Sequence, residues 1–245
     1  MRGNISLGRV FGIPLRLHYT WLIIFALVTV SLVLNPLVEP PYPPIAQRII
    51  LGILTSLLFF ASIIIHELAH GWVANKMGDS TAKWLGRLSL NPVKHLDPIG
   101  TLMLFFFGFG WAKPVPVNFN NLHDPRKGLI LVSAAGIIAN TILAFLALLL
   151  LRVLNPAPFG AVSIFLIYMA QINIMLAAFN LIPIPPLDGS KILMGFSSPQ
   201  FQYTMARLEP YGFFIIIALL YLNILDPLIA LFEWIITGII SLLLP

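Results

Sequence analysis

The feature that most constrains this sequence is a set of long apolar segments, each near or above the roughly 20 residues that a membrane-spanning helix needs. The four clear segments cover residues 17–34, 45–75, 128–151 and 161–182. A fifth apolar region, 213–244, is broken at Asp226-Pro227, so it forms either one bent helix or a helical hairpin. This pattern predicts a polytopic membrane protein.

The composition supports that interpretation. Of 245 residues, 59% are hydrophobic and 9% are charged, whereas a soluble domain carries about 25% charged residues. These charged residues are too few to cover the surface of a water-soluble protein of this size. Lipid must therefore be the main solvent. The chain has no cysteine, which excludes disulfides and thiolate ligands, so any metal must be held by nitrogen and oxygen.

Between the second and third clear spans lies a polar stretch, residues 76–127, that contains a short apolar island at 99–109. The island is too short to cross a membrane alone, so we interpret it as re-entrant or interfacial. The predicted fold class is therefore an all-α polytopic membrane protein with about six transmembrane helices and this one re-entrant or interfacial segment. We expect a single domain over 1–245.

The distribution of Lys and Arg predicts the orientation, because cytoplasmic loops carry an excess of both. If the N-terminus is cytoplasmic and the four clear spans alternate, only Arg48 and Arg152 of the 14 basic residues lie on the outer side. This bias explains the net charge of +5 as membrane topology, so we expect no nucleic-acid partner. We expect a multi-pass protein of the cell (inner, or cytoplasmic) membrane with its N-terminus in the cytoplasm.

The second span contains the pattern HExxH as His66-Glu67-Leu68-Ala69-His70. Two histidines four residues apart project from one face of a helix and can bind one zinc ion, with the glutamate beside them as general base. Ionisable side chains are expensive in a membrane helix unless they have a function. The pattern therefore predicts a metal site, on the cytoplasmic side of the bilayer centre.

Catalytic zinc usually has three protein ligands and a water, so one more is needed. The other candidates are His18, His95, Asp97, His123, Asp124, Asp188, Asp226 and Glu233. Caps, turns and interfacial positions are adequate explanations for most of them. Asp188 differs, because it follows three prolines that break the chain after the fourth span, and non-helical backbone at membrane depth is tolerated only where it is packed in protein or lines a cavity. The orientation also places Asp188 on the same side as the histidine pair, so it is the predicted third ligand.

These residues resemble the site-2 protease family of intramembrane zinc metalloproteases, in its compact bacterial and archaeal form without PDZ or CBS domains. The resemblance covers roughly residues 60–195 and rests on HExxH, on Asn180 to Gly189 with its Leu-Asp-Gly, and on motifs between them such as His95-Leu96-Asp97-Pro98. One departure is Ala135-Gly136-Ile137-Ile138-Ala139-Asn140, which lacks the proline that family members commonly have before this asparagine.

The resemblance implies one Zn²⁺ held by His66, His70 and Asp188, with Glu67 as catalytic base and Asn180 in contact with substrate or transition state. It implies a catalytic core at about 45–195, followed by the C-terminal helix or hairpin at 212–244. The expected reaction is hydrolysis of peptide bonds within or near transmembrane segments. The expected partner is a transmembrane protein substrate, such as a membrane-anchored regulator or a signal-peptide remnant.

Two other functions are open to a chain with this motif. An inactive homologue would bind membrane helices without cutting them, and the intact Glu67 argues against it. A zinc transporter would need polar groups repeated across the membrane, whereas the ionisable residues here cluster at one depth. The sequence does not identify the substrate, the need for an earlier cut by another protease, the oligomeric state, or roles for His95, Asp97 and the 108–110 segment.

Overall fold

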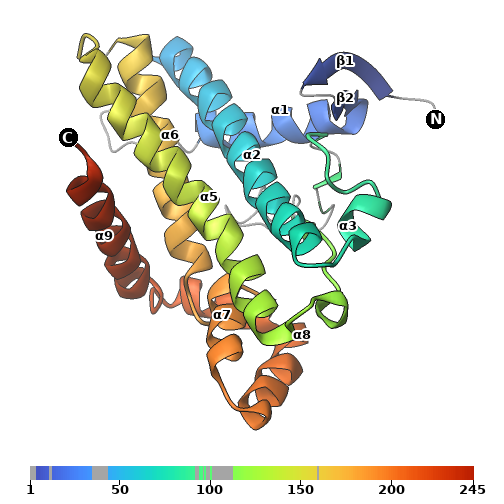
Figure 1. Ribbon diagram of the computed structural model, residues 1–245. Coiled ribbons are helices and arrows are strands. Elements are labelled where there is room, and N and C mark those ends of the chain that lie inside the picture. Colours follow the sequence, from blue (N-terminus) through green and yellow to red (C-terminus); the bar gives the residue numbers. More distant parts are fainter. Residues whose placement is uncertain are drawn as a thin grey trace.

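The computed structural model describes residues 4–10, 13–34, 44–91, 94–95, 97, 100, 113–158 and 160–245 (Figure 1). Its elements in chain order are β1 (Asn4–Val10), β2 (Ile13–His18), α1 (Tyr19–Leu34), α2 (Ile45–Lys76), α3 (Thr81–Trp84), the 3₁₀ turn η2 (Phe119–Asn121), α5 (Pro125–Leu154), α6 (Ala161–Asn180), α7 (Asp188–Phe196), α8 (Pro199–Tyr221) and α9 (Asp226–Leu243).

The centre of the molecule is a bundle of three long helices, α2, α5 and α6, which run side by side in Figure 1. Small side chains line the surface between α5 and α6, namely Ala144, Ala147, Ala170 and Ala177, all of them buried. Small residues let the backbones of membrane helices approach closely, and tight packing is what holds such helices together in lipid. Helix α9 packs against α6 on the outside of this bundle.

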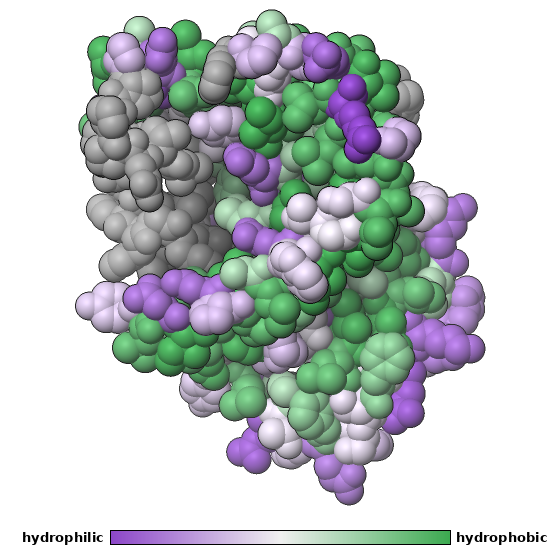
Figure 2. All heavy atoms as spheres, turned by 90° about the vertical axis from the view of Figure 1, so that its left-hand side faces the viewer, coloured by the Kyte–Doolittle hydropathy of each residue, from purple (hydrophilic) through white to green (hydrophobic). Residues whose placement is uncertain are grey.

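Among the described residues, five helices are long and apolar enough to cross a membrane: α2, α5, α6, α8 and α9. Helix α1 has 16 residues and therefore a length of about 24 Å, short of the roughly 30 Å of hydrocarbon. Figure 2 shows hydrophobic residues over much of the coloured surface, with hydrophilic residues at its top, bottom and right-hand edge and also across its centre and left. The predicted all-α polytopic class is confirmed, while the sixth span remains a prediction.

The structure adds two features to the predicted elements. Residues 4–18 form an antiparallel hairpin, in which Asn4 pairs with His18 and Val10 with Ile13. The C-terminal apolar region is two helices, and α8 begins at Pro199, well before residue 212. The expected re-entrant island at 99–109 lies outside the described residues, apart from Gly100.

The loop between α6 and α7 is held by contacts with both C-terminal helices. The side chain of Ile182 is fully buried and packs with Ile216 of α8 and Leu225 at the start of α9. Helix α8 also approaches the loop backbone, because a Cβ atom added to Gly212 would lie 1.9 Å from the carbonyl oxygen of Pro185. This packing fixes the place at which α7 begins, and therefore the position of its first residue, Asp188.

Candidate metal centre

Helix α2 presents three ionisable side chains to the interior of the bundle. His66 and His70 are one helical turn apart, so both imidazoles lie on the same face, with ring centroids 4.6 Å apart. Together with Glu67 they are buried, each with less than 10% of its surface exposed. Three buried ionisable groups in an apolar helix are costly unless other residues stabilise them, so they indicate a site to which another segment contributes.

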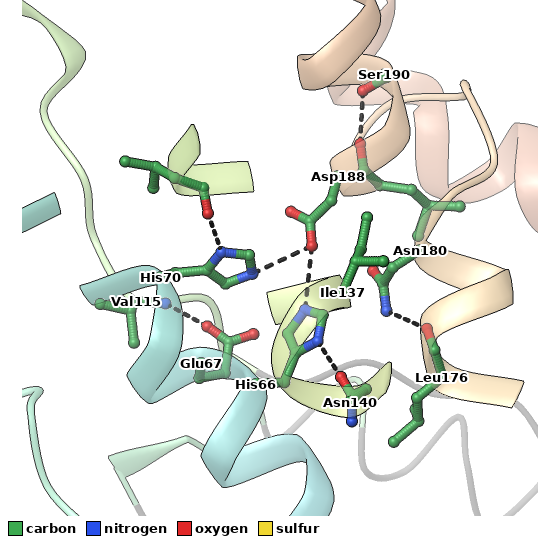
Figure 3. Close-up of polar contacts among 12 residues, drawn as sticks. His66, Glu67, His70, Val115, Ile137, Asn140, Leu176, Asn180, Asp188 and Ser190 are labelled. Atoms are coloured by element: carbon green, nitrogen blue, oxygen red, sulfur yellow. Dashed lines mark hydrogen bonds and ion pairs between the residues drawn. The ribbon is translucent and has the colours of Figure 1, made fainter. Parts of the chain in front are cut away.

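The partner is Asp188, the first residue of α7, which lies beside both imidazoles in Figure 3. Its Oδ2 atom is 3.1 Å from Nε2 of His66 and 3.1 Å from Nε2 of His70. The approach depends on a glycine next to it, since a Cβ atom on Gly189 would lie 2.1 Å from the carbonyl oxygen of Leu181. The backbone therefore folds back tightly where the aspartate enters the site.

This donor set fits a zinc ion. His66, His70 and Asp188 each offer one ligand atom, all three atoms lie within 4.8 Å of one another, and all three residues are buried. In a tetrahedral site with bonds of about 2.1 Å, neighbouring ligand atoms are separated by roughly 3.4 Å, close to the nitrogen–oxygen distances seen here. Three protein ligands of nitrogen and oxygen leave the fourth position for water or substrate, as catalytic zinc requires.

Each histidine is oriented by a hydrogen bond from its other ring nitrogen. Nδ1 of His70 lies 2.6 Å from the carbonyl oxygen of Val132 on α5, and a carbonyl only accepts, so Nδ1 carries the proton. Nδ1 of His66 lies 2.5 Å from Oδ1 of Asn140, also on α5. Hydrogen bonds of this kind turn the Nε2 atoms of both rings towards Asp188, which is the arrangement that a bound metal needs.

Helix α5 can approach the site this closely only because residue 136 is glycine. A Cβ atom at Gly136 would lie 2.5 Å from Cε1 and Nε2 of His66 and 2.6 Å from Nε2 of His70. Any side chain there would displace the imidazoles from the metal position. In the sequence, Gly136 and Asn140 are visible only as part of a motif, because one sequence does not show which helix faces the histidines.

The carboxylate of Glu67 is held by backbone from the polar stretch. Its Oε2 atom accepts a hydrogen bond of 2.8 Å from the amide of Val115, as Figure 3 shows. Arg87 fixes this part of the chain by donating to the carbonyl oxygens of Lys113, at 2.9 Å, and Pro114, at 3.1 Å. Glu67 therefore lies beside the metal position, with Oε2 bonded and with no hydrogen bond to Oε1 within the described residues.

Asn180 lies at the C-terminal end of α6, near Asp188 in Figure 3. Its amide nitrogen donates to the carbonyl oxygen of Leu176, one turn back in the same helix, at 2.9 Å. Within the described residues it has no hydrogen bond to His66, His70 or Asp188. A role for Asn180 in contact with substrate therefore remains a prediction.

Three of the other candidates, Asp124, Asp97 and His95, have local structural roles. Asp124 caps α5 by accepting from the amides of Arg126 and Lys127, and Asp97 accepts from the amide of Gly100. His95 is buried and bonds the carbonyl oxygen of Ser89 through Nε2 at 2.6 Å. None of these residues joins a metal-binding group in the part of the chain that the structure describes.

A multi-pass helical protein that buries an HExxH pair and a distant aspartate around one cation position is a membrane zinc metalloprotease. Comparison with known proteins supports this class. Residues 156–222 match the model of peptidase family M50. The putative zinc metalloprotease YwhC of Bacillus subtilis is 45% identical over 166 residues, which cover 64% of this chain and 75% of that protein. The chain belongs to peptidase family M50, the site-2 protease family.

Longer relatives are also similar. The zinc metalloprotease MJ0392 of Methanocaldococcus jannaschii is 27% identical over 203 residues, and the match covers 83% of this chain but 48% of that protein. The solved structure of the Site-2 Protease from Methanocaldococcus jannaschii aligns with 95% of this chain and 92% of its own, with 22% identity and a TM-score of 0.43.

Proposed function

We propose that this protein is an intramembrane zinc metalloendopeptidase that holds one zinc ion per chain through His66, His70 and Asp188. The observation that carries the proposal is the convergence of two segments 122 residues apart, which brings one carboxylate oxygen to 3.1 Å from both imidazoles. Burying three such groups together in an apolar bundle is costly, and a cation between them offsets that cost.

A zinc ion in this position supplies Lewis acidity, which polarises a peptide carbonyl and acidifies a water molecule. Glu67 is the base that takes the proton from that water. Its Oε2 atom is engaged by the amide of Val115, whereas Oε1 accepts no hydrogen bond within the described residues, so Oε1 is the oxygen that receives the proton. The protonated carboxyl then delivers the proton to the nitrogen of the leaving amine.

Asn180 supports the same step in this proposal. The side-chain amide nitrogen of Asn180 has two N–H donors, and one of them donates to the carbonyl oxygen of Leu176. The second N–H can donate to the carbonyl oxygen of the substrate as negative charge develops on it. Loss of one such donor typically costs about 2.7–4 kcal/mol of transition-state stabilisation.

The proposed substrates are transmembrane proteins, such as membrane-anchored regulators or remnants of signal peptides. The site lies within a spanning helix, because His66 is ten residues before the end of α2 at Lys76, or about 15 Å along the axis. A helix entering from the bilayer has every carbonyl bonded internally, so it must unwind before the scissile bond can meet Glu67. The substrate segment is therefore one that unwinds locally.

We place the protein in the cell (cytoplasmic) membrane, with the N-terminus and the active site on the cytoplasmic side. The support is the distribution of basic residues, since Arg48 and Arg152 alone fall on the outer side under this orientation. An inactive homologue and a zinc transporter are less well supported. The transporter hypothesis calls for polar groups along a path through the membrane, and the described residues contain no second cation site along the bundle.

The proposal is tested by purifying the protein in detergent, measuring bound zinc, and incubating it with a single-span substrate. Glu67→Gln should retain zinc and lose cleavage by a factor of about 10² to 10⁴, the usual contribution of a general base. Asp188→Asn should lose zinc, while Asp226→Asn, an exposed aspartate at the start of α9, should behave as wild type. Retained turnover in Glu67→Gln would refute the assignment.

A further inference from the structure

A chain of hydrogen bonds leads from His66 away from the metal position and across the bundle. Nδ1 of His66 lies 2.5 Å from Oδ1 of Asn140 on α5, and Nδ2 of Asn140 donates to Oδ1 of Asn173 on α6 at 2.7 Å. Nδ2 of Asn173 in turn donates to the carbonyl oxygen of Met169 at 2.8 Å and to Oγ of Ser62 on α2 at 2.9 Å. Both asparagines are fully buried.

The donor and acceptor of every hydrogen bond in this series follow from the bond at its end, between Asn173 and Met169. The carbonyl of Met169 can only accept, so the atom of Asn173 that faces it must be the amide nitrogen. The oxygen of Asn173 then faces Asn140, which must present its own amide nitrogen there and its oxygen to His66. Since that oxygen can only accept, the proton of the imidazole lies on Nδ1, and Nε2 has a free lone pair.

We propose that Asn140 and Asn173 are positioning residues that hold His66 in the tautomer with Nδ1 protonated and Nε2 available to the metal. The inference rests on the proposed function, because it concerns how the metal position is prepared. His70 reaches the same tautomer through the backbone carbonyl of Val132, which no substitution removes. His66 depends on side chains instead, so its orientation can be altered separately from that of His70.

A purely structural role is the competing explanation, because buried asparagines also join membrane helices by hydrogen bonds. The two explanations predict different effects of Asn140→Asp on zinc binding. A carboxylate keeps an acceptor for Nδ1 of His66 but turns an oxygen towards Oδ1 of Asn173, where the wild type has a donor. If Asn140 only joins helices, Asn140→Asp should impair the protein at least as much as an apolar substitution does. If it positions His66, the aspartate preserves zinc binding and the apolar residue does not.

The test compares zinc affinity, by competition with a chromophoric chelator, in the full-length protein and its variants. Asn140→Leu, of similar size but without an acceptor, should bind zinc about 10- to 100-fold more weakly, the usual effect of losing such a partner. Asn140→Asp should bind zinc with nearly wild-type affinity. Thr141→Val is the matched control on α5, because within the described residues the hydroxyl of Thr141 bonds only the carbonyl oxygen of Ile137 in its own helix, and zinc affinity should not change.

A second measurement needs no variant at Asn140. Nitrogen-15 NMR of histidine-labelled, zinc-loaded wild type should show His66 protonated at Nδ1 and bound to zinc through Nε2, with its signals identified by their loss in His66→Gln. Zinc on Nδ1 of His66, or wild-type affinity in Asn140→Leu, would overturn the inference and leave the proposed function intact. A wild-type protein that binds no zinc would overturn the proposed function, and the inference with it.

Discussion

The carboxylate of Asp188 and the two imidazoles of α2 form a site that is complete in its donors and nearly closed to solvent. The three residues are each less than 10% exposed, and each imidazole has one nitrogen directed to Asp188 and the other bonded to α5. Because both ring nitrogens have partners, the imidazoles have little freedom to rotate. A metal that enters this site finds its ligands already oriented, so little ordering entropy is lost on binding.

The close approach of Gly136 to the imidazoles predicts that a side chain there weakens zinc binding. Gly136→Ala places a methyl group 2.5 Å from the ring of His66, so either the imidazole or helix α5 must move. Overpacking of this kind typically costs about 1–3 kcal/mol. We expect zinc affinity to fall sharply, measured by chelator competition. Gly238→Ala in α9 is the control, since its added methyl group meets nothing within 4 Å, and equal zinc affinity in the two variants would contradict the prediction.

Arg87 is predicted to act on Glu67 through the backbone. Its guanidinium bonds the carbonyl oxygens of Lys113 and Pro114, which directly precede the amide that holds the carboxylate. Arg87→Lys keeps the charge but loses the planar guanidinium, whose Nη2 atom donates to both carbonyl oxygens. We expect a lower kcat with zinc content unchanged, measured by cleavage of a single-span substrate.

Arg207→Lys is the matched control for this prediction, because Arg207 lies on α8 and contacts the ring of Tyr203. It should leave kcat at the wild-type value. Loss of zinc from Arg87→Lys, or cleavage as fast as in wild type, would show that the guanidinium does not act through Glu67.

A buried carboxylate, that of Asp79, connects the C-terminal end of helix α2 to the polar stretch that follows it. Asp79 is fully buried and accepts from the side chain and amide of Thr81, the amide of Asn118 at 2.7 Å, and the side chain of Asn121 at 3.0 Å. The connection holds the segment before α5 against the turn after α2. Both of these helices contribute to the metal position, so the carboxylate supports the site from a distance.

This carboxylate predicts a pH dependence of stability. Burial raises the pKa of Asp79, but the hydrogen bonds from Thr81, Asn121 and Asn118 outweigh it, and the pKa is lowered below its ordinary value. A lowered pKa in the folded state stabilises the protein above the pKa of the unfolded chain, about 3.9, and that contribution is lost as the pH falls below it. Asp79→Asn should therefore lower Tm at pH 7, with a difference that shrinks towards pH 3.

The comparison is made by thermal unfolding of both proteins at several pH values. Asp226→Asn serves as the control, since Asp226 is exposed at the start of α9 and should show no such pH-dependent difference. A difference between wild type and Asp79→Asn that stays constant from pH 7 to pH 3 would contradict the prediction.

For the whole molecule, the orientation is a prediction that the chain makes easy to test, because it contains no cysteine. Single cysteines are introduced at Lys83, exposed after α2, and at Asn155, exposed after α5. A membrane-impermeant maleimide added to intact cells should label Asn155→Cys and leave Lys83→Cys unlabelled until the membrane is opened. The reverse pattern would invert the proposed topology.

Much of the helical framework could be predicted from the sequence, because its signal is local. The spans expected at 45–75, 128–151 and 161–182 correspond to α2, α5 and α6, with ends that differ by at most three residues. The start of α8 was not predicted, because its first half is not apolar. The capping signal was present nonetheless, in the hydroxyl of Ser198, which accepts from the amide of Phe201.

The site shows the same division between local and tertiary signals. His66 and His70 were found by their spacing, and Asp188 by the prolines that break the chain before it. Gly136 and Asn140 matter only because α5 faces α2, a relation between distant segments that one sequence does not express. Their roles therefore required the packed structure.

The donor atoms of the metal position come from two helices, and a third helix orients them: α2 carries the imidazoles, α7 the carboxylate, and α5 the groups that direct both rings. None of these helices can hold the ion by itself. A newly made chain therefore acquires its complete donor set, and with it the capacity to cut, only after these helices have docked.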